Sequence, residues 1–97
     1  IKPLLEVRGG KVEAIESVRT RKKSLARILD LVDERIAGRS PIRICAIHAS
    51  ALDEAEMLLA QAKQRFDPVE SFISEVSPVI GTHTGPGTIG LAYCAGI

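Results

Sequence analysis

The fold is decided by residues 41–66, which read PIRICAIHASALDEAEMLLAQAKQRF. Pro41 to Ala49 is a near-continuous apolar run, which favours a strand buried on both faces, as in a parallel sheet. Ser50 and Asp53 match a capping box and predict a helix from Ala51 to about Arg65. The apolar face of this helix is formed by Leu52, Ala55, Leu58 or Leu59, Ala62 and Phe66. The stretch therefore predicts one strand followed by one helix against the same sheet.

Signals on both sides of this unit complete the order of elements. Residues 1–8 and 11–18 alternate weakly around Gly9-Gly10, which predicts an antiparallel hairpin with a bulge near Ala14. Apolar residues at helical spacing predict a helix that runs to about Ala37, with Thr20 as its cap and Gly38 as its terminator. Further strands are expected over 68–76 and 88–95, with a helical turn between them. The predicted fold class is α/β, a mixed sheet with helices packed against it, in the order β-β-α-β-α-β-turn-β.

Composition excludes several classes of function. The chain has 97 residues, which fits one domain over 1–97, and its net charge of +1 gives no global field to recruit nucleic acid. Its three aromatic residues are too few for a base-stacking platform. No apolar run approaches the roughly 18 residues needed to span a bilayer, and no signal peptide is visible. Cys45 and Cys94 lie in apolar runs and are predicted to be buried free thiols in a reducing compartment.

Residues 80–90 carry the densest chemistry and read IGTHTGPGTIG. Glycines allow a backbone to approach a ligand closely, and threonine hydroxyls with a histidine ring suit an anionic or carbonyl ligand. A tight turn between two elements explains the same composition, so both interpretations stay open. The candidate anion site combines the hydroxyls of Thr82 and Thr84, the ring of His83 and the charge of Arg19. It requires the end of the hairpin and the glycine-rich segment to lie side by side.

Other polar groups have two interpretations each. Arg19, Arg21, Lys22 and Lys23 crowd the start of the first helix, where they either hold an anion or extend into water. His48 lies at the end of a predicted strand, just before a helix, which is a common place for a ligand site in an open α/β sheet. It is either a ligand-binding residue or a histidine that hydrogen-bonds locally. Neither histidine has Cys, Asp or Glu neighbours at zinc-site spacing, so no metal is predicted.

Several segments of the chain resemble the DegV family. They are Lys2-Pro3-Leu4-Leu5, Gly10-Lys11-Val12, the basic segment from Val18 to Lys23, and above all Ser77 to Thr88, which reads SPVIGTHTGPGT. His48 before an acidic, alanine-rich helix fits as well. The resemblance covers the whole chain and implies the C-terminal lobe of a two-lobed protein. Because the chain begins at Ile1 with residues that already read as structured, we expect it to be a piece of a longer protein.

The resemblance implies a function for the parent protein. DegV-family proteins bind a long-chain fatty acid between their lobes. Several are the acyl carrier subunit of bacterial fatty acid kinase. A partner kinase then phosphorylates the carboxylate of the bound fatty acid. The chain is thus expected to be part of a cytoplasmic lipid-binding subunit, not itself an enzyme, with a fatty acid as ligand and no other cofactor. A fatty acid kinase catalytic subunit is the expected partner, transient contact with a membrane or an acyltransferase is compatible with this role, and no nucleic acid is expected.

The resemblance also assigns residues. The family's head-group histidine and arginine map onto His83 and Arg19, with Thr84 beside His83. Additional head-group candidates are Thr82, Gly85, Gly87 and Thr20. The resemblance names no tail-facing residues on this lobe. We expect acyl-tail contacts from the apolar residues Ile80, Ile89 and Leu91, which ordinary core packing explains equally well. The alternative function is a small hydrolase or transferase that uses His83 as acid or base.

Overall fold

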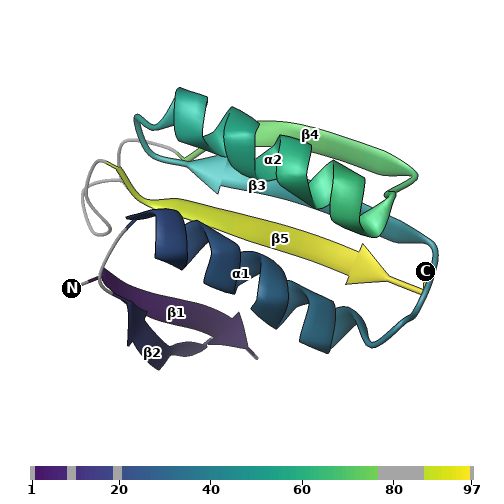
Figure 1. Ribbon diagram of the computed structural model, residues 1–97, viewed down its shortest axis with the longest axis horizontal. Helices are drawn as coiled ribbons and strands as arrows, with labels where there is room; N and C mark the ends of the chain where they lie inside the picture. The colour runs from purple at the N-terminus through teal and green to yellow at the C-terminus, as the bar shows by residue number, and fades with distance from the viewer. Residues whose placement is uncertain (1, 9–10, 19–20, 77–86, 97) are drawn as a thin grey trace. The chain divides into compact units, whose positions relative to one another are not determined.

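The chain folds as an α/β protein with the predicted order of elements. The computed structural model describes residues 2–8, 11–18, 21–76 and 87–96. The elements are β1 (Lys2–Arg8), β2 (Lys11–Val18), α1 (Arg21–Ile36), β3 (Ile42–His48), α2 (Leu52–Phe66), β4 (Glu70–Glu75) and β5 (Ile89–Ala95) (Figure 1). They form two compact units, Ile1–Leu31 and Val32–Ile97, which are described separately. That these residues make one domain and one lobe of a larger protein stays a prediction.

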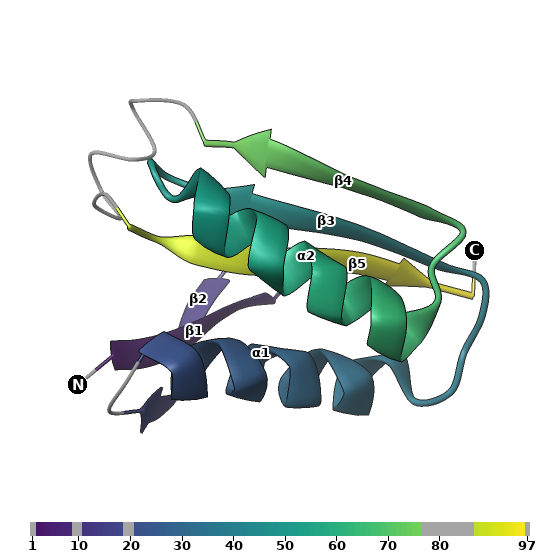
Figure 2. The same ribbon diagram turned by 45° about the horizontal axis from the view of Figure 1, so that its top comes forward.

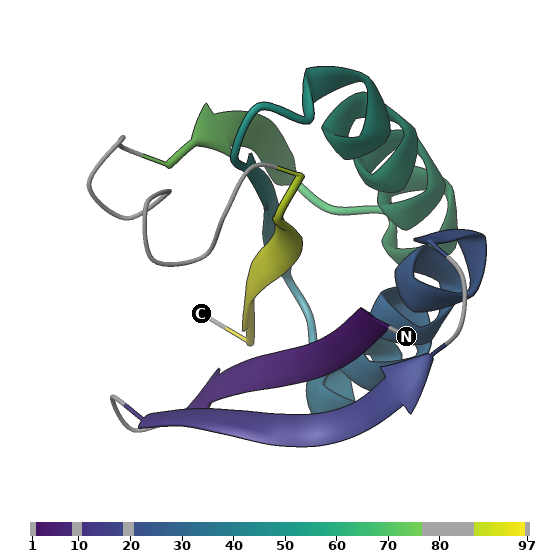
Figure 3. The ribbon, with the colours of Figure 1, turned by 90° about the vertical axis from the view of Figure 1, so that its left-hand side faces the viewer.

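The first unit contains the predicted hairpin. Strands β1 and β2 pair antiparallel, as Figure 3 shows. The register shifts between Leu4, which lies opposite Glu16, and Leu5, which lies opposite Ala14. Ile15 is therefore the extra residue of a β-bulge, next to the predicted position. Thr20, the predicted cap of the first helix, lies outside the described residues.

Helix α1 follows its apolar periodicity. The buried side chains Leu25, Leu29, Val32 and Ile36 recur every three or four residues and form one stripe. The helix ends at Ile36, and Gly38 follows with φ 74°, a conformation in which glycine avoids the Cβ clash. Gly38 therefore terminates the helix as the sequence predicts.

The second unit is built around β3. The strand order is β4-β3-β5, with β3 parallel to β4 and antiparallel to β5 (Figure 2). Helix α2 connects β3 to its parallel neighbour β4 and packs on one face of the sheet. The core lies between helix and sheet, where Ala55, Leu58, Ala62 and Phe66 of α2 and Ile44, Ala46 and His48 of β3 are buried. Leu52 was expected in this stripe, but it is half exposed in the first turn of the helix.

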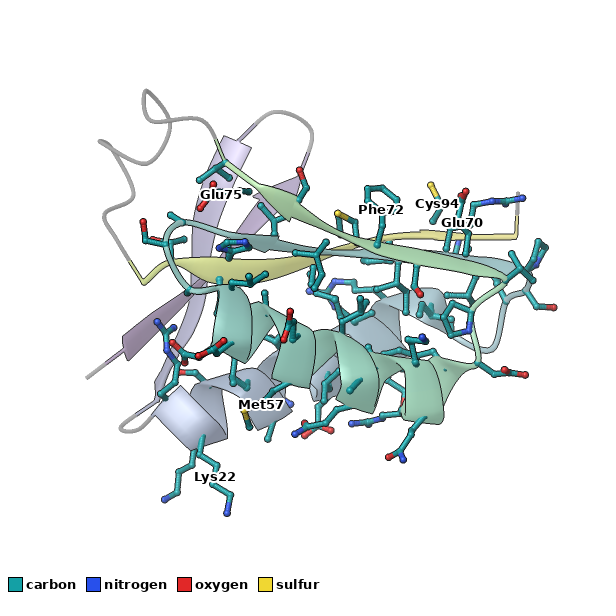
Figure 4. All side chains as sticks on the ribbon, turned by 90° about the horizontal axis from the view of Figure 1, so that it is seen from above. Lys22, Met57, Glu70, Phe72, Glu75 and Cys94 are labelled. Carbon is teal, nitrogen blue, oxygen red and sulfur yellow. The ribbon has the colours of Figure 1, made fainter. Side chains whose placement is uncertain are left out.

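The opposite side of this sheet is less covered. Register places Cys45 of β3 between Phe72 of β4 and Ala92 of β5, and the row beside it contains Ile47, Ser74 and Gly90. Phe72 is 54 % exposed, and Figure 4 shows Phe72 and Cys94 on the side of the sheet away from α2. We call this surface, formed by Cys45, Ile47, Phe72, Ser74, Gly90, Ala92 and Cys94, the open face.

The open face corrects two predictions. β3 was expected to be buried on both sides, but within the described part of this unit α2 covers one face only, which leaves Arg43 exposed and Cys45 and Ile47 half-buried. Both cysteines are free, as predicted, yet Cys94 is exposed and Cys45 half-buried. An apolar run therefore indicated a central strand correctly but overstated how many layers cover it.

Candidate functional site

The carboxyl end of β3 is organised by the ring of His48. The side chain is buried, with 4 % relative exposure, and its Nδ1 accepts a hydrogen bond of 3.1 Å from the backbone N–H of Ala51. A ring nitrogen that accepts a hydrogen bond carries no proton, so this geometry assigns the neutral tautomer with its hydrogen on Nε2. The ring thus binds a backbone donor that precedes α2.

This bond replaces the predicted capping box. The N-cap position of α2 is Ala51, which makes no side-chain capping hydrogen bond, and the helix begins at Leu52. Ser50 has φ 54°, in the left-handed region, one residue before that cap. The prediction of Ser50 as the cap was therefore wrong. The residue types matched a capping box, but the N-cap position is Ala51, one residue later. The backbone N–H of Ala51 is bound by His48.

A carboxylate lies beside the same ring. Register places Glu75 of β4 opposite His48, and its Oε2 is 4.0 Å from Nδ1. The Glu75 side chain is largely exposed, whereas that of His48 is buried. Because Nδ1 accepts the Ala51 hydrogen, the two groups are not an ion pair in the neutral state, and the contact becomes attractive only if the ring is protonated.

The backbone at this position binds the residues on both sides of 77–86. The N–H of Val76 donates to the carbonyl of His48 at 2.9 Å, and the N–H of Gly87 donates to the carbonyl of Ala49 at 2.7 Å. The N–H of Ala49 donates in turn to the carbonyl of Thr88 at 2.9 Å. We call residues 48–51 the exit turn. It fixes the residues before and after 77–86, the segment that contains His83.

Most of the predicted site residues cannot be compared with this geometry. Arg19, Thr20, Ile80, Thr82, His83, Thr84 and Gly85 lie outside the described residues, as does the helical turn expected at Ser77-Pro78. The convergence of Arg19 and His83 on one anion therefore stays a prediction. Gly87 is described, with φ 87°. Ile89 pairs with His48 and Leu91 with Ala46, so both lie half-buried on the face that bears α2.

The remaining charged candidates carry no described site. Lys22 and Lys23 are exposed at the start of α1, and Figure 4 shows Lys22 extending from that end. Among the described residues, no three His, Cys, Asp or Glu side chains are arranged to hold a metal ion. None of the helices in the described ranges is long and apolar enough to cross a membrane.

Comparison with known proteins identifies the family. The model of the DegV family, described as uncharacterised proteins, matches residues 1–96. The chain belongs to the DegV family. It is 42 % identical over 93 residues to a DegV domain-containing protein of Halalkalibacterium halodurans, and 35 % identical over 94 residues to protein DegV of Bacillus subtilis. These alignments cover 96 % and 97 % of this chain but 33 % and 34 % of those relatives.

Solved DegV structures share the fold. A Bacillus subtilis DegV described as a fatty acid binding protein matches with a TM-score of 0.83 and 34 % identity over 96 % of this chain and 33 % of its own. A DegV lipid binding protein of Thermotoga maritima matches with a TM-score of 0.87 and 27 % identity, over 96 % and 33 %. The chain thus spans about a third of the length of the DegV proteins that it resembles.

The exit turn is the feature that sequence reasoning missed in this DegV chain. Its hydrogen bonds are made mainly by backbone groups, which every residue carries. The available signal was the small-residue run Ala49-Ser50-Ala51 directly after a histidine at the end of a strand. Small side chains permit a close approach of neighbouring backbone, as the 2.7 Å contact between Gly87 and Ala49 requires.

Proposed function

We propose that this chain is the C-terminal lobe of a DegV protein that binds a long-chain fatty acid in a cleft between lobes. In this proposal it presents the fatty carboxylate to a partner kinase, which forms an acyl phosphate. The observation that carries the proposal is the likeness over 96 % of this chain to a Bacillus subtilis DegV described as a fatty acid binding protein. A DegV family protein of Thermus thermophilus, whose structure is also described in terms of fatty acid binding, is 30 % identical to this chain and supports the same proposal.

The open face suits the apolar wall of such a cleft. A fatty acid gains about 0.8 kcal/mol for each methylene that leaves water, so its tail requires apolar protein surface. Phe72 is 54 % exposed and lies in a row with Cys45 and Ala92, which presents apolar atoms across all three strands. We therefore assign tail contacts to Phe72 and Ile47 and keep the predicted Ile80. Ile89 and Leu91, also predicted, lie on the face that bears α2 and are not part of this wall.

The head group is assigned to the edge of the sheet at the exit turn. His48 and Ala49 hold Val76 and Gly87, and these residues flank the segment that contains His83 and Thr84. In the proposal, His83 and Arg19 bind the carboxylate and the phosphate that replaces it, because a guanidinium offers a bidentate fork to either group. Thr84, Thr82, Thr20, Gly85 and Gly87 are the additional candidates. This lobe supplies no catalytic residue, since the kinase transfers the phosphoryl group.

An assay with the kinase tests this function. Full-length protein, a bacterial fatty acid kinase catalytic subunit, ATP and a C16 or C18 fatty acid should together yield acyl phosphate, detected as hydroxamate after hydroxylamine trapping. Omission of the DegV protein should abolish the product. A parallel screen of ester and phosphate substrates should show no turnover that depends on His83. Hydrolysis that disappears in His83→Ala, without acyl phosphate formation in the first assay, would establish the hydrolase alternative instead.

A further inference from the structure

The buried side chain of His48 binds the exit turn, whose carbonyls accept hydrogen bonds from Val76 and Gly87. Ser50 adopts φ 54°, an unfavourable conformation for a residue with a Cβ, so the turn needs a compensating interaction. The ring of His48 provides it by accepting the N–H of Ala51, the residue that follows Ser50. The ring is 4 % exposed, which leaves little access for water to replace it as acceptor. The path of the turn therefore depends on an acceptor at the Nδ1 position.

The same turn supplies the carbonyls that bind the residues on both sides of 77–86. The carbonyl of His48 accepts from Val76, and that of Ala49 accepts from Gly87, at 2.9 and 2.7 Å. These residues are eleven positions apart in sequence, yet they bind adjacent carbonyls. A change in the path of residues 49–50 would move one carbonyl relative to the other. The separation of Val76 and Gly87 would then change as well.

We infer that His48 is a positioning residue for head-group binding. Its neutral ring sets the exit turn, and the exit turn binds Val76 and Gly87, the described residues on either side of 77–86. This inference rests on the proposed function for its binding consequence, but its structural part concerns the described residues alone. His48 does not touch the ligand in this account. It acts through Val76 and Gly87.

The acceptor role of the ring distinguishes it from simple packing. Its Nδ1 accepts the Ala51 hydrogen, and the carboxylate beside it, Glu75 Oε2 at 4.0 Å, has no hydrogen to offer in its place. The β5 residue opposite His48 is Ile89, which has no polar side chain to take over the contact.

Three substitutions separate the acceptor from the volume of the side chain. In His48→Asn, the amide Oδ1 is bonded to Cγ, as Nδ1 is in histidine. The variant therefore keeps an acceptor close to the Nδ1 position, and this acceptor does not become protonated. His48→Gln places its oxygen one bond further out, nearer the Nε2 position. His48→Leu fills similar space without an acceptor. A role in packing alone predicts that Leu is tolerated best, whereas a role as acceptor predicts that Asn is.

The experiment uses the full-length protein and two readouts. Hydrogen exchange measures protection of the amides of Ala51, Val76 and Gly87, and fluorescence titration with cis-parinaric acid measures affinity. At pH 8 we expect the Asn variant to stay within about threefold of wild type in both readouts. We expect the Gln and Leu variants to lose about tenfold in protection and in affinity, as befits one buried hydrogen bond.

Each outcome decides the inference. Equal losses in all three variants, or a Leu variant that behaves like wild type, would overturn it. If the Gln and Leu variants do not fold, the Asn variant decides, and a loss of protection at Ala51, Val76 and Gly87 well beyond threefold would overturn the inference. A wild-type protein that binds no fatty acid would refute the proposed function, while the exchange data would still test the positioning of Val76 and Gly87 by His48.

Discussion

The amide of Gly87 donates a 2.7 Å hydrogen bond to the carbonyl of Ala49, which joins the start of β5 to the turn that leaves β3. Gly87 does so with φ 87°, a backbone conformation that other residues adopt only with strain. Together with the bond from Val76 to His48, this contact fixes the described residues on both sides of 77–86. Backbone hydrogen bonds therefore fix the described residues that flank the segment to which the head-group histidine was assigned.

Gly87→Ala should destabilise the protein by about 1–2 kcal/mol, because a Cβ at this φ clashes with neighbouring backbone. Urea unfolding of the 97-residue chain measures the change. Gly90→Ala is the matched control, since a Cβ built there meets no atom within 4 Å. It should change stability by less than about 0.5 kcal/mol. Equal effects of the two substitutions would contradict the role assigned to the positive φ of Gly87.

The two phenylalanines of the second unit should separate binding from stability. Phe72→Ala should weaken fatty acid affinity of the full-length protein roughly tenfold or more, because it removes apolar surface from the open face. It should cost little stability, since the ring is 54 % exposed. Phe66→Ala should instead cost about 3–5 kcal/mol, because Phe66 is a buried residue at the end of α2. Unchanged affinity in a folded Phe72→Ala variant would remove the open face from the proposed cleft.

The two thiols should react at different rates. Cys94 is exposed, whereas partial burial raises the pKa of the Cys45 thiol, an effect that a hydrogen bond with the Ser74 backbone only partly opposes. At pH 7.5, iodoacetamide should therefore modify Cys94 first in the folded 97-residue chain, and both at similar rates in urea. Peptide mass spectrometry of the time course measures both sites. Faster modification of Cys45 in the folded state would contradict its described environment.

The raised pKa of Cys45 also gives stability a pH dependence. The folded state favours the thiol form, so this contribution is fully present below the ordinary thiol pKa and disappears as pH rises through the raised value. Urea unfolding from pH 7 to pH 10 should show a loss at the alkaline end that is smaller in Cys45→Ser. A Cys94→Ser variant provides the control and should retain the loss. The same alkaline profile in Cys45→Ser and wild type would contradict this origin.

The sequence predicted the architecture well because that information is local. Helical spacing of Leu25, Leu29 and Val32 was sufficient for α1, and a break in alternation located the bulge at Ile15 within one residue. The sequence failed where two local patterns competed for one donor. Ser50 satisfies the capping pattern, but His48 takes the Ala51 amide, and only the three-dimensional path of the turn decides between them.

Coverage of the sheet was the other property that the sequence could not give. The run from Ile42 to Ile47 is equally apolar whether one or two layers cover the strand, so the exposure of Phe72 and Cys94 was not foreseen. The proposed head-group residues Arg19 and His83 came from resemblance to the DegV family. Their residue types allow anion binding, but their convergence depends on long-range geometry that no local pattern encodes.

Arg19→Ala and His83→Ala should damage acyl phosphate formation more than acyl binding, because charge on the head group increases when the carboxylate is phosphorylated. We expect at least about a tenfold loss of the kinase-dependent rate, with affinity for the fatty acid changed less than about threefold. Lys22→Ala, at an exposed position near Arg19 in sequence, is the control and should behave like wild type. Equal losses of binding and rate would place both residues in tail binding or in folding instead.

If the full-length protein holds a fatty acid, that lipid should co-purify with it, and its identification is the decisive measurement. Native mass spectrometry of the full-length protein, followed by denaturation and lipid extraction, should yield one long-chain fatty acid for each protein molecule. Phe72→Ala should lower this occupancy. If the folded wild-type protein never carries an acyl chain, even after incubation with free fatty acids from C14 to C18, the proposed function is wrong.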